Sequence, residues 1–137
     1  MRVLFRRSGA AIAVAIAAAI SMPALALADS GDGKTACNVG EICFARDDAT
    51  VRYQKHFWYG ASHDNYYFWD TVENDPDGSE LKNNADQVRN RDRTCDVKVI
   101  DDRGLLPDDV QTIPNNGVWT PLKDSVDNEN DRHERVC

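Results

Sequence analysis

The sequence predicts an all-β protein, a small antiparallel sandwich of two sheets. Short stretches in which apolar and polar residues alternate are separated by turns rich in glycine, proline, asparagine and aspartate. That spacing is typical of antiparallel β-domains. No stretch has the periodicity of a long amphipathic helix. Four cysteines in a chain with the features of an exported protein add the expectation of two disulfides.

The first residues have the features of a cleaved signal peptide, which we assign to residues 1–28. Three arginines precede an apolar run from Ala10 to Ile20, and Ala26-Leu27-Ala28 fits the small-x-small cleavage rule. The run is too short for a transmembrane helix, although an uncleaved signal anchor is the alternative. We therefore expect a secreted, extracellular protein.

The mature chain would run from Asp29 to Cys137, the size of one small domain. Its residues 29–36 are polar and glycine-rich, so we expect a flexible leader. Removal of the signal peptide takes away three arginines and no acidic residue, which changes the formal net charge from −7 to −10. Such an acidic surface argues against nucleic acid and anionic membranes as partners. It suits extracellular solubility, cation binding or a basic partner.

The cysteines Cys37, Cys43, Cys95 and Cys137 all lie in the mature chain. An even number in a small exported chain indicates two disulfides, and three connectivities are possible. We favour Cys37–Cys43, which closes a short local loop, with Cys95–Cys137 anchoring the last residue. Zinc binding is the alternative, but no Cys-x-x-Cys pair or Cys/His cluster in the sequence supports it. Each bridge should contribute about 2–4 kcal/mol.

Two local patterns each occur twice. Residues 82–88 form a polar, asparagine-rich segment that ends in a valine, and residues 130–136 resemble it. Residues 95–99 alternate apolar and polar side chains as a half-buried strand does, and residues 42–48 share the pattern of a strand followed by an acidic pair. The chain therefore looks like one unit used twice, about residues 37–90 and about residues 93–137.

The remaining elements follow from local composition. Strands are expected at about residues 42–46, 51–54, 95–99, 110–113 and 118–122. Loops are expected at Asp70–Ser79 and Asp101–Asp109, and Pro114-Asn115-Asn116-Gly117 is a strong turn. Residues 124–135 are highly polar.

Eight of the ten aromatic residues of the mature chain fall between Tyr53 and Trp69. One interpretation is that these rings build the core of a small β-domain with few aliphatic residues. The functional interpretation is an exposed aromatic surface for a sugar or a protein partner. Its candidate residues are Trp58, Tyr59, Tyr66 and Trp69. Both interpretations can hold, because neighbours along a strand point to opposite faces.

Recognisable catalytic motifs are absent from the sequence. His56, His63 and His133 lack metal-binding spacing, and there is no Gly-x-Ser-x-Gly or phosphate-binding glycine loop. With four cysteines in bridges, no free thiol remains as a nucleophile. We interpret the many carboxylates as a solvated acidic surface. The sequence therefore predicts a binding protein without a cofactor, and not an enzyme.

These features together resemble the secreted bacterial peptidase inhibitors of βγ-crystallin-like fold, a family typified by the actinomycete metalloproteinase inhibitor. The resemblance rests on export, the Cys37-x5-Cys43 pair, a strand leading to an acidic pair, the aromatic-rich middle, and a polar segment ending in valine. It covers residues 37–137. It implies a Greek-key sandwich of two similar motifs, protease inhibition and no cofactor.

An inhibitor of this kind needs a stiff scaffold that presents a loop to an active-site cleft, because rigidity lowers the entropy cost of binding. The candidate loop is Arg103-Gly104-Leu105-Leu106-Pro107, which places apolar side chains beside a proline. The resemblance implies a thermolysin-like target that favours bulky apolar residues after the cut, so Leu105 and Leu106 are the candidate contacts. The alternative is that both leucines fold back into the core.

The resemblance also raises the question of calcium. The closing segment of βγ-crystallin units commonly has the sequence Asn-Asp-x-x-Ser-Ser-Val, and its Asn-Asp matches Asn130-Asp131 before Val136. The first unit has Lys82-Asn83 at that place. Both serines are replaced in each unit, and lysine or arginine sits poorly beside a divalent cation. The second unit, with Asn130, Asp131 and Glu134, is the better candidate.

The predicted function is a secreted, monomeric peptidase inhibitor that binds a protease, with metalloproteases as the implied class. The alternatives lack inhibitory activity. One is an extracellular module that binds cell-wall polysaccharide through the aromatic residues. The other is a calcium-binding structural domain.

Overall fold

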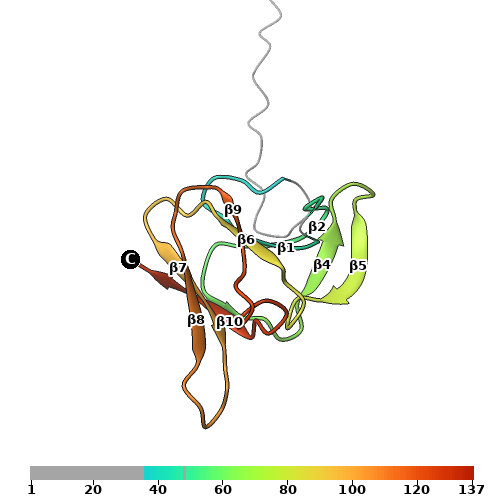
Figure 1. Ribbon diagram of the computed structural model, residues 1–137. Helices are drawn as coiled ribbons and strands as arrows, with labels where there is room; N and C mark the ends of the chain where they lie inside the picture. Colours follow the sequence, from blue (N-terminus) through green and yellow to red (C-terminus); the bar gives the residue numbers. More distant parts are fainter. Residues whose placement is uncertain (1–35, 48) are drawn as a thin grey trace, which may run out of the picture.

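The computed structural model describes residues 36–47 and 49–137. Two antiparallel β-sheets pack against each other as a sandwich, as the sequence predicts (Figure 1). The expected signal peptide, and the leader up to residue 35, lie outside the described residues. Within the described part, no helix is long and apolar enough to cross a membrane.

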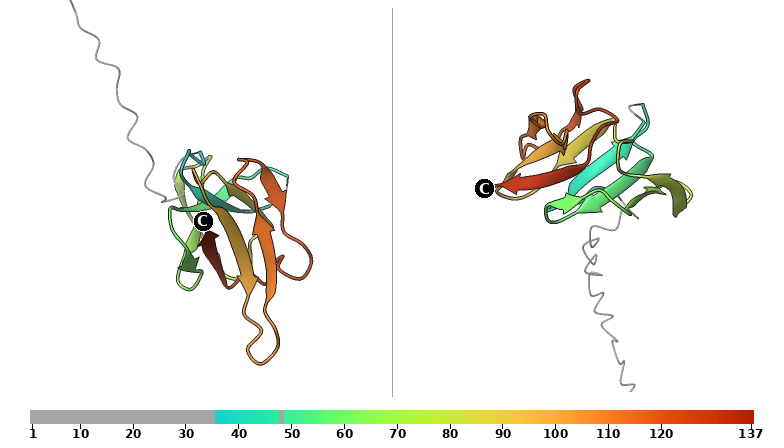
Figure 2. Two further views of the ribbon diagram at one scale, coloured as in Figure 1. Left: turned by 90° about the vertical axis from the view of Figure 1, so that its left-hand side faces the viewer. Right: turned by 90° about the horizontal axis from the view of Figure 1, so that it is seen from below.

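Ten strands form the two sheets. The larger sheet has the order β5-β4-β2-β1-β6-β9, and the smaller has the order β3-β10-β7-β8. The strand bounds are β1 Ile42–Arg46, β2 Tyr53–Phe57, β3 Ala61–Ser62, β4 Tyr67–Asp70, β5 Asp75–Glu80, β6 Gln87–Asn90, β7 Asp96–Asp101, β8 Asp109–Ile113, β9 Trp119–Pro121 and β10 Arg132–Val136. Figure 2 shows the two layers from other sides.

Most of the expected strands are present, two expectations need correction, and one polar stretch contains a strand that was not expected. The second strand begins at Tyr53, later than the expected residue 51. The expected loop Asp70–Ser79 contains β5, whose residues are mostly exposed because it is the edge strand of its sheet. The polar stretch 124–135 contains most of β10, where His133 is the only buried residue. In both cases polar composition concealed a strand with little buried surface.

The two sheets share one topology. The order β2-β1-β6-β9 in the larger sheet matches β8-β7-β10-β3 in the smaller one, if β1 corresponds to β7, β2 to β8 and β6 to β10. The first half of the chain therefore supplies β3 to the smaller sheet, while the second half supplies β9 to the larger one. The reciprocal exchange of a strand ties the two halves of the chain together.

The register corrects how the two closing segments align. Phe44 of β1 pairs with Val88, whereas Val99 of β7 pairs with His133. His133 is therefore the counterpart of Val88, and the expected match of Val88 with Val136 is wrong by three residues. The shift pairs Asn83 with Asn128, which share a left-handed backbone with φ of 56°.

The closing segments also contact each other across the repeat. The backbone N–H of Asn83 donates to the carbonyl of Asn130 (3.2 Å), and the N–H of Asn128 donates to the carbonyl of Ala85 (3.3 Å). Ala85 and Asn130 are themselves equivalent in the repeat. The two bonds are thus related by the same pseudo-twofold symmetry as the strands.

The core lies between the sheets, and Phe44 is at its centre. Its ring contacts Phe57, His63 and His133, with centroids 6.0, 4.7 and 4.9 Å away. The core cluster consists of Ile42, Phe44, Phe57, Phe68, Leu81, Ala85, Val88, Val97, Val99, Ile113, Leu122 and Val126. Two of the eight clustered aromatics belong to it, and Tyr53 and Tyr66 pack against it. The core interpretation of that stretch is thus correct for half of its rings.

The disulfides have the connectivity we favoured. Cys37 is bonded to Cys43 of β1, and Cys95, just before β7, is bonded to Cys137, just after β10. The first bridge closes a local loop, and the second joins two neighbouring strands.

Candidate functional site

The loop between β7 and β8 projects beyond the body of the sandwich (Figures 1 and 2). The β7–β8 ladder ends at the pair Asp101↔Asp109, so residues 102–108 form the tip. Gly104 has a φ of +65°, which favours glycine, and the N–H of Leu106 donates to the carbonyl of Arg103 (3.3 Å). These features turn the chain back within a few residues.

The two leucines at this tip face solvent. Leu105 has a relative exposure of 105% and Leu106 of 57%. The alternative that they fold back into the core is therefore wrong. Large apolar side chains with this exposure contribute almost nothing to the stability of the fold through burial. They are therefore candidates for contact with another molecule.

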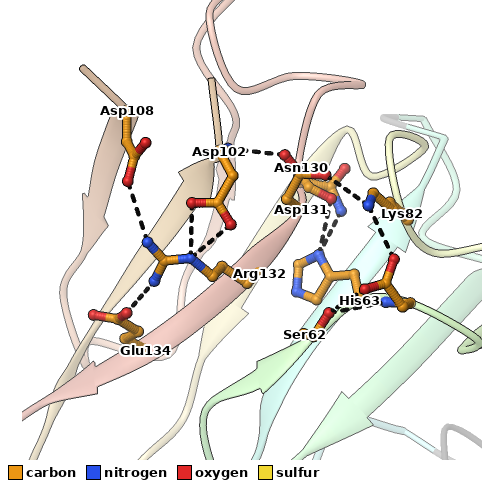
Figure 3. A network of polar contacts seen from close by, with 10 residues as sticks. Ser62, His63, Lys82, Asp102, Asp108, Asn130, Asp131, Arg132 and Glu134 are labelled. Atoms are coloured by element: carbon orange, nitrogen blue, oxygen red, sulfur yellow. Dashed lines mark hydrogen bonds and ion pairs between the residues drawn. The ribbon is translucent and has the colours of Figure 1, made fainter. Parts of the chain in front are cut away.

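Arg132 of β10 braces the base of the tip (Figure 3). Its Nε donates to both carboxylate oxygens of Asp102 (3.0 and 2.9 Å), and its Nη2 donates to Asp108 (3.2 Å). Its Nη1 contacts Glu134. The hydrogen bonds to Asp102 raise the pKa of Arg132 most, and the contact with Glu134 raises it further. One guanidinium thus joins the residues on both sides of the loop.

A second arginine acts within the loop itself. Arg103 Nη1 lies 2.9 Å from Asp109 Oδ2, and its Nε lies 4.0 Å from Asp101 Oδ2. Loss of hydration, with the nearby charges of Asp131 and Glu129, raises the pKa of the Asp101 carboxyl. The stem is therefore rich in carboxylates, and its arginines hold them together.

The network continues from the tip to the body of the domain. Asp131 Oδ2 accepts a hydrogen bond from the N–H of Asp102 (2.8 Å), and Asp131 Oδ1 lies 3.1 Å from Lys82 Nζ. Lys82 also lies 2.9 Å from Asp64, which accepts a bond from Ser62 of β3 (2.7 Å). The base of the tip is thus tied to both halves of the repeat (Figure 3).

The predicted calcium ligands have other partners. The Asn130 side chain is buried, where its Oδ1 accepts from the N–H of Ala85 (3.0 Å) and its Nδ2 donates to the carbonyl of Leu81 (2.9 Å). Asp131 pairs with Lys82, and Glu134 pairs with Arg132. Among the described residues, the clusters with metal-ligand spacing lie elsewhere, at Cys37, Glu41 and Cys43 and at Asp70, Glu73 and Asp75. The structure does not bring Asn130, Asp131 and Glu134 together as a cation site.

The predicted aromatic surface is divided. Trp58 (44% exposed) borders an open hollow of about 480 Å³, beside Val39 and Arg93. Tyr59 (54% exposed) instead hydrogen-bonds Tyr66, which raises the pKa of the Tyr66 phenol. Trp69 lies on β4, and its indole N–H donates to Asn74 (3.3 Å). Tyr59 and Tyr66 thus contact each other, whereas Trp58 and Trp69 have other neighbours. Tyr67, which was not among the four candidates, is exposed as well.

All three histidines are buried, which sequence reasoning missed. His63 Nε2 lies 2.9 Å from His133 Nδ1, and His133 Nε2 lies 2.8 Å from the carbonyl of Tyr59. Burial lowers the pKa of His63 to about 4 and that of His133 to about 3. One indication in the sequence is that His133 aligns with the buried Val88 when the two closing segments are compared. That alignment can be made only with the strand register of the structure.

Comparison with known proteins adds no relative: no family model, curated protein or solved structure matches the chain. The candidate site therefore rests on the geometry of the β7–β8 tip alone.

The bracing role of Arg132 can be tested by Arg132→Gln. Without its guanidinium, the carboxylates of Asp102 and Asp108 repel each other, so backbone order at residues 102–108 should fall. Because these ion pairs are largely solvent-exposed, the free energy of unfolding should drop by about 1 kcal/mol or less. NMR order parameters measure the first effect, and urea denaturation measures the second.

Arg46→Gln is the matched control, since Arg46 pairs with Asp77 near a different hairpin. It should leave the order of the tip unchanged. Equal order parameters at residues 102–108 in the wild type and in Arg132→Gln would contradict the bracing role.

The buried histidine pair predicts acid-sensitive stability. Folding lowers both pKa values, so the unfolded chain takes up protons first as the pH falls below about 6.5. The free energy of unfolding should therefore be fully present above that pH. It should fall by on the order of 5 kcal/mol between pH 6.5 and pH 4, with the two histidines contributing about equally. Denaturant titrations across this range measure it, with His133→Gln expected to show a shallower slope. A free energy of unfolding that stays constant from pH 7 to pH 4 would show that folding does not lower the pKa values of these two histidines.

Proposed function

We propose that this protein is a secreted peptidase inhibitor that inserts the β7–β8 tip into the active-site cleft of a protease. The observation that carries the proposal is the exposure of Leu105 and Leu106 at the end of a braced, projecting loop. Metalloproteases are the first class to test, because the sequence resembles the crystallin-like metalloproteinase inhibitors.

The shape of the tip supports this function. A protease cleft accepts a narrow, convex segment, and the tip is a single turn at the end of a two-stranded stem. Its apolar side chains point to solvent and would lose water on binding, which stabilises a complex. The surrounding stem carries several charges that would form a polar rim around such a contact.

The bracing of the tip supports inhibition over cleavage. A loop that is already held in one shape loses little entropy on binding and resists the distortion that peptide hydrolysis requires. Arg132 and Arg103 fix both ends of the loop, and Asp131 links it to the domain.

We also propose that the domain is of the βγ-crystallin type. The matching strand orders and the reciprocal exchange of β3 and β9 support two similar Greek-key units. The paired left-handed asparagines, Asn83 and Asn128, support the same relation between the closing segments.

The decisive experiment titrates a thermolysin-type metalloprotease with the folded, oxidised protein and its Leu105→Asp variant. We expect stoichiometric loss of protease activity with the wild type. We expect roughly 10- to 100-fold weaker inhibition with Leu105→Asp, because a charge replaces an apolar contact. Since Leu105 is fully exposed, the free energy of unfolding should change by less than about 0.5 kcal/mol.

Val72→Asp is the matched control, because Val72 is an exposed valine (72%) in the turn after β4. It should inhibit as the wild type does. Full protease activity at a large excess of folded protein would remove metalloproteases as targets, and the same titration would then be repeated with serine proteases.

Glycan binding is the second candidate function, supported by the exposed indole of Trp58 at the rim of its hollow. Cell-wall polysaccharide should then quench tryptophan fluorescence, and Trp58→Ala should abolish the change while Leu105→Asp leaves it intact. An unchanged spectrum at saturating polysaccharide would remove this candidate.

A further inference from the structure

Four potential metal ligands meet in the interior, far from the tip in sequence. They are Cys37, Glu41, Cys43 and His56, and each is at most 4% exposed. Cys43 and His56 are direct partners across the β1–β2 ladder, so their side chains point to the same face of the sheet. The short loop that starts at Cys37 brings the other two residues over that face.

Glu41 Oε2 lies between the sulfur of Cys43 and the imidazole of His56, at distances close to those between neighbouring ligands of one metal ion. His56 Nδ1 lies 3.2 Å from Glu41 Oε2, and Cys43 Sγ lies 3.9 Å from the same oxygen. The ligand atoms of Cys37, Glu41 and Cys43 all lie within 4.8 Å of one another. Around zinc, Zn–S bonds of about 2.3 Å and Zn–N or Zn–O bonds of about 2.0–2.2 Å place neighbouring ligand atoms roughly 3.3–3.8 Å apart.

The histidine is also oriented as a ligand would be. Gln54 Nε2 donates to the carbonyl of Val51 (2.5 Å), so Gln54 Oε1 accepts from His56 Nε2 (2.9 Å). This contact assigns a proton to Nε2 and leaves Nδ1 facing Glu41. Zinc-binding histidines are commonly held in this way by a hydrogen bond from the other ring nitrogen.

We propose that, when the Cys37–Cys43 bond is reduced, these four side chains bind one zinc ion through the two sulfurs, Glu41 Oε2 and His56 Nδ1. A dithiol supplies the two electrons and two protons that convert the disulfide into two thiols, and itself becomes a disulfide. Zinc then replaces the two thiol protons, which are released.

The loop has contacts that keep it in place without its disulfide. Arg91 alone makes three: its carbonyl accepts from the N–H of Gly40 (2.7 Å), its N–H donates to the carbonyl of Glu41 (2.8 Å), and its Nη1 donates to the carbonyl of Cys37 (2.6 Å). Two thiolates and one carboxylate around Zn²⁺ leave a net charge of −1, and this guanidinium lies next to them. The same loop would therefore be clamped by a covalent bond under oxidising conditions and by a metal under reducing ones.

The experiment uses the full chain, reduced anaerobically with a phosphine. The phosphine becomes a phosphine oxide by taking an oxygen atom from water, and the two hydrogens of that water go to the sulfurs. Cobalt(II) serves as the spectroscopic probe and is then displaced by zinc. We expect one ion per chain, the visible bands of tetrahedral cobalt, and a sulfur-to-cobalt charge-transfer band of two-thiolate intensity. The oxidised protein should give none of these bands.

Variants locate the site. Cys37→Ser with Cys43→Ser should abolish the charge-transfer band, while Cys95→Ala with Cys137→Ala, the other bridge, should retain it. His56→Gln and Glu41→Gln should each weaken zinc binding by more than about 100-fold, since loss of an outer-sphere partner alone costs 10- to 100-fold. Two substitutions are used so that one misfolded variant does not decide the result.

Three results would overturn the proposal. The first is a failure to bind metal. Either the reduced chain keeps the near-UV circular dichroism of a folded protein and binds no cobalt, or it unfolds and zinc does not refold it. The second is a charge-transfer band that survives the loss of Cys37 and Cys43. The third is unchanged zinc affinity in both folded His56→Gln and Glu41→Gln.

Discussion

The exchange of β3 and β9 between the two halves is the constraint on which the rest of the structure depends. Neither half closes its own sheet, because each gives one strand to the sheet of the other. The core can therefore form only when both halves are present, with Phe44 of the first half packed on His133 of the second. The backbone bonds from Asn83 and Asn128 fasten the same junction from the two closing segments. Folding of the halves is thus coupled through their interface.

This coupling explains why a polar pair of histidines is tolerated at the centre. Valine at the place of His133 would pack as Val88 does in the other half, but it would offer no hydrogen bond. His133 bonds to His63 and to the carbonyl of Tyr59, so one side chain joins β10 to the segment around β3. A series of buried hydrogen bonds in which every polar group has a partner favours one arrangement of the residues around it. Burial requires both imidazole rings to stay neutral.

The fold could be predicted from the sequence where apolar alternation was strong, and not where strands were polar. Alternation located β7, the apolar run before an acidic pair located β1, and the number and spacing of cysteines gave both disulfides. Alternation failed to reveal β5 and β10, because their side chains are mostly exposed and leave no apolar pattern to detect. The tip was found because Leu105 and Leu106 are apolar residues beside Pro107 in an otherwise polar loop. Its bracing was not, because Arg132 reaches Asp102 and Asp108 only through the pairing of β10 with β7. The cluster around His56 likewise depends on ladder register, which no local spacing reveals.

The two hairpin loops that follow β1 and β7 differ in how they are attached to the sheets. In the first half, the loop after β1 is fastened to the sheet, where Gln87 donates to the carbonyl of Asp47 and Gln54 to that of Val51. In the second half, the corresponding loop extends into solvent with its leucines uncovered. Substitutions in the first loop would break these bonds to the sheet, whereas substitutions at the exposed tip of the second would leave the core intact. The domain therefore has one hairpin loop whose sequence can vary at little cost to the stability of the fold.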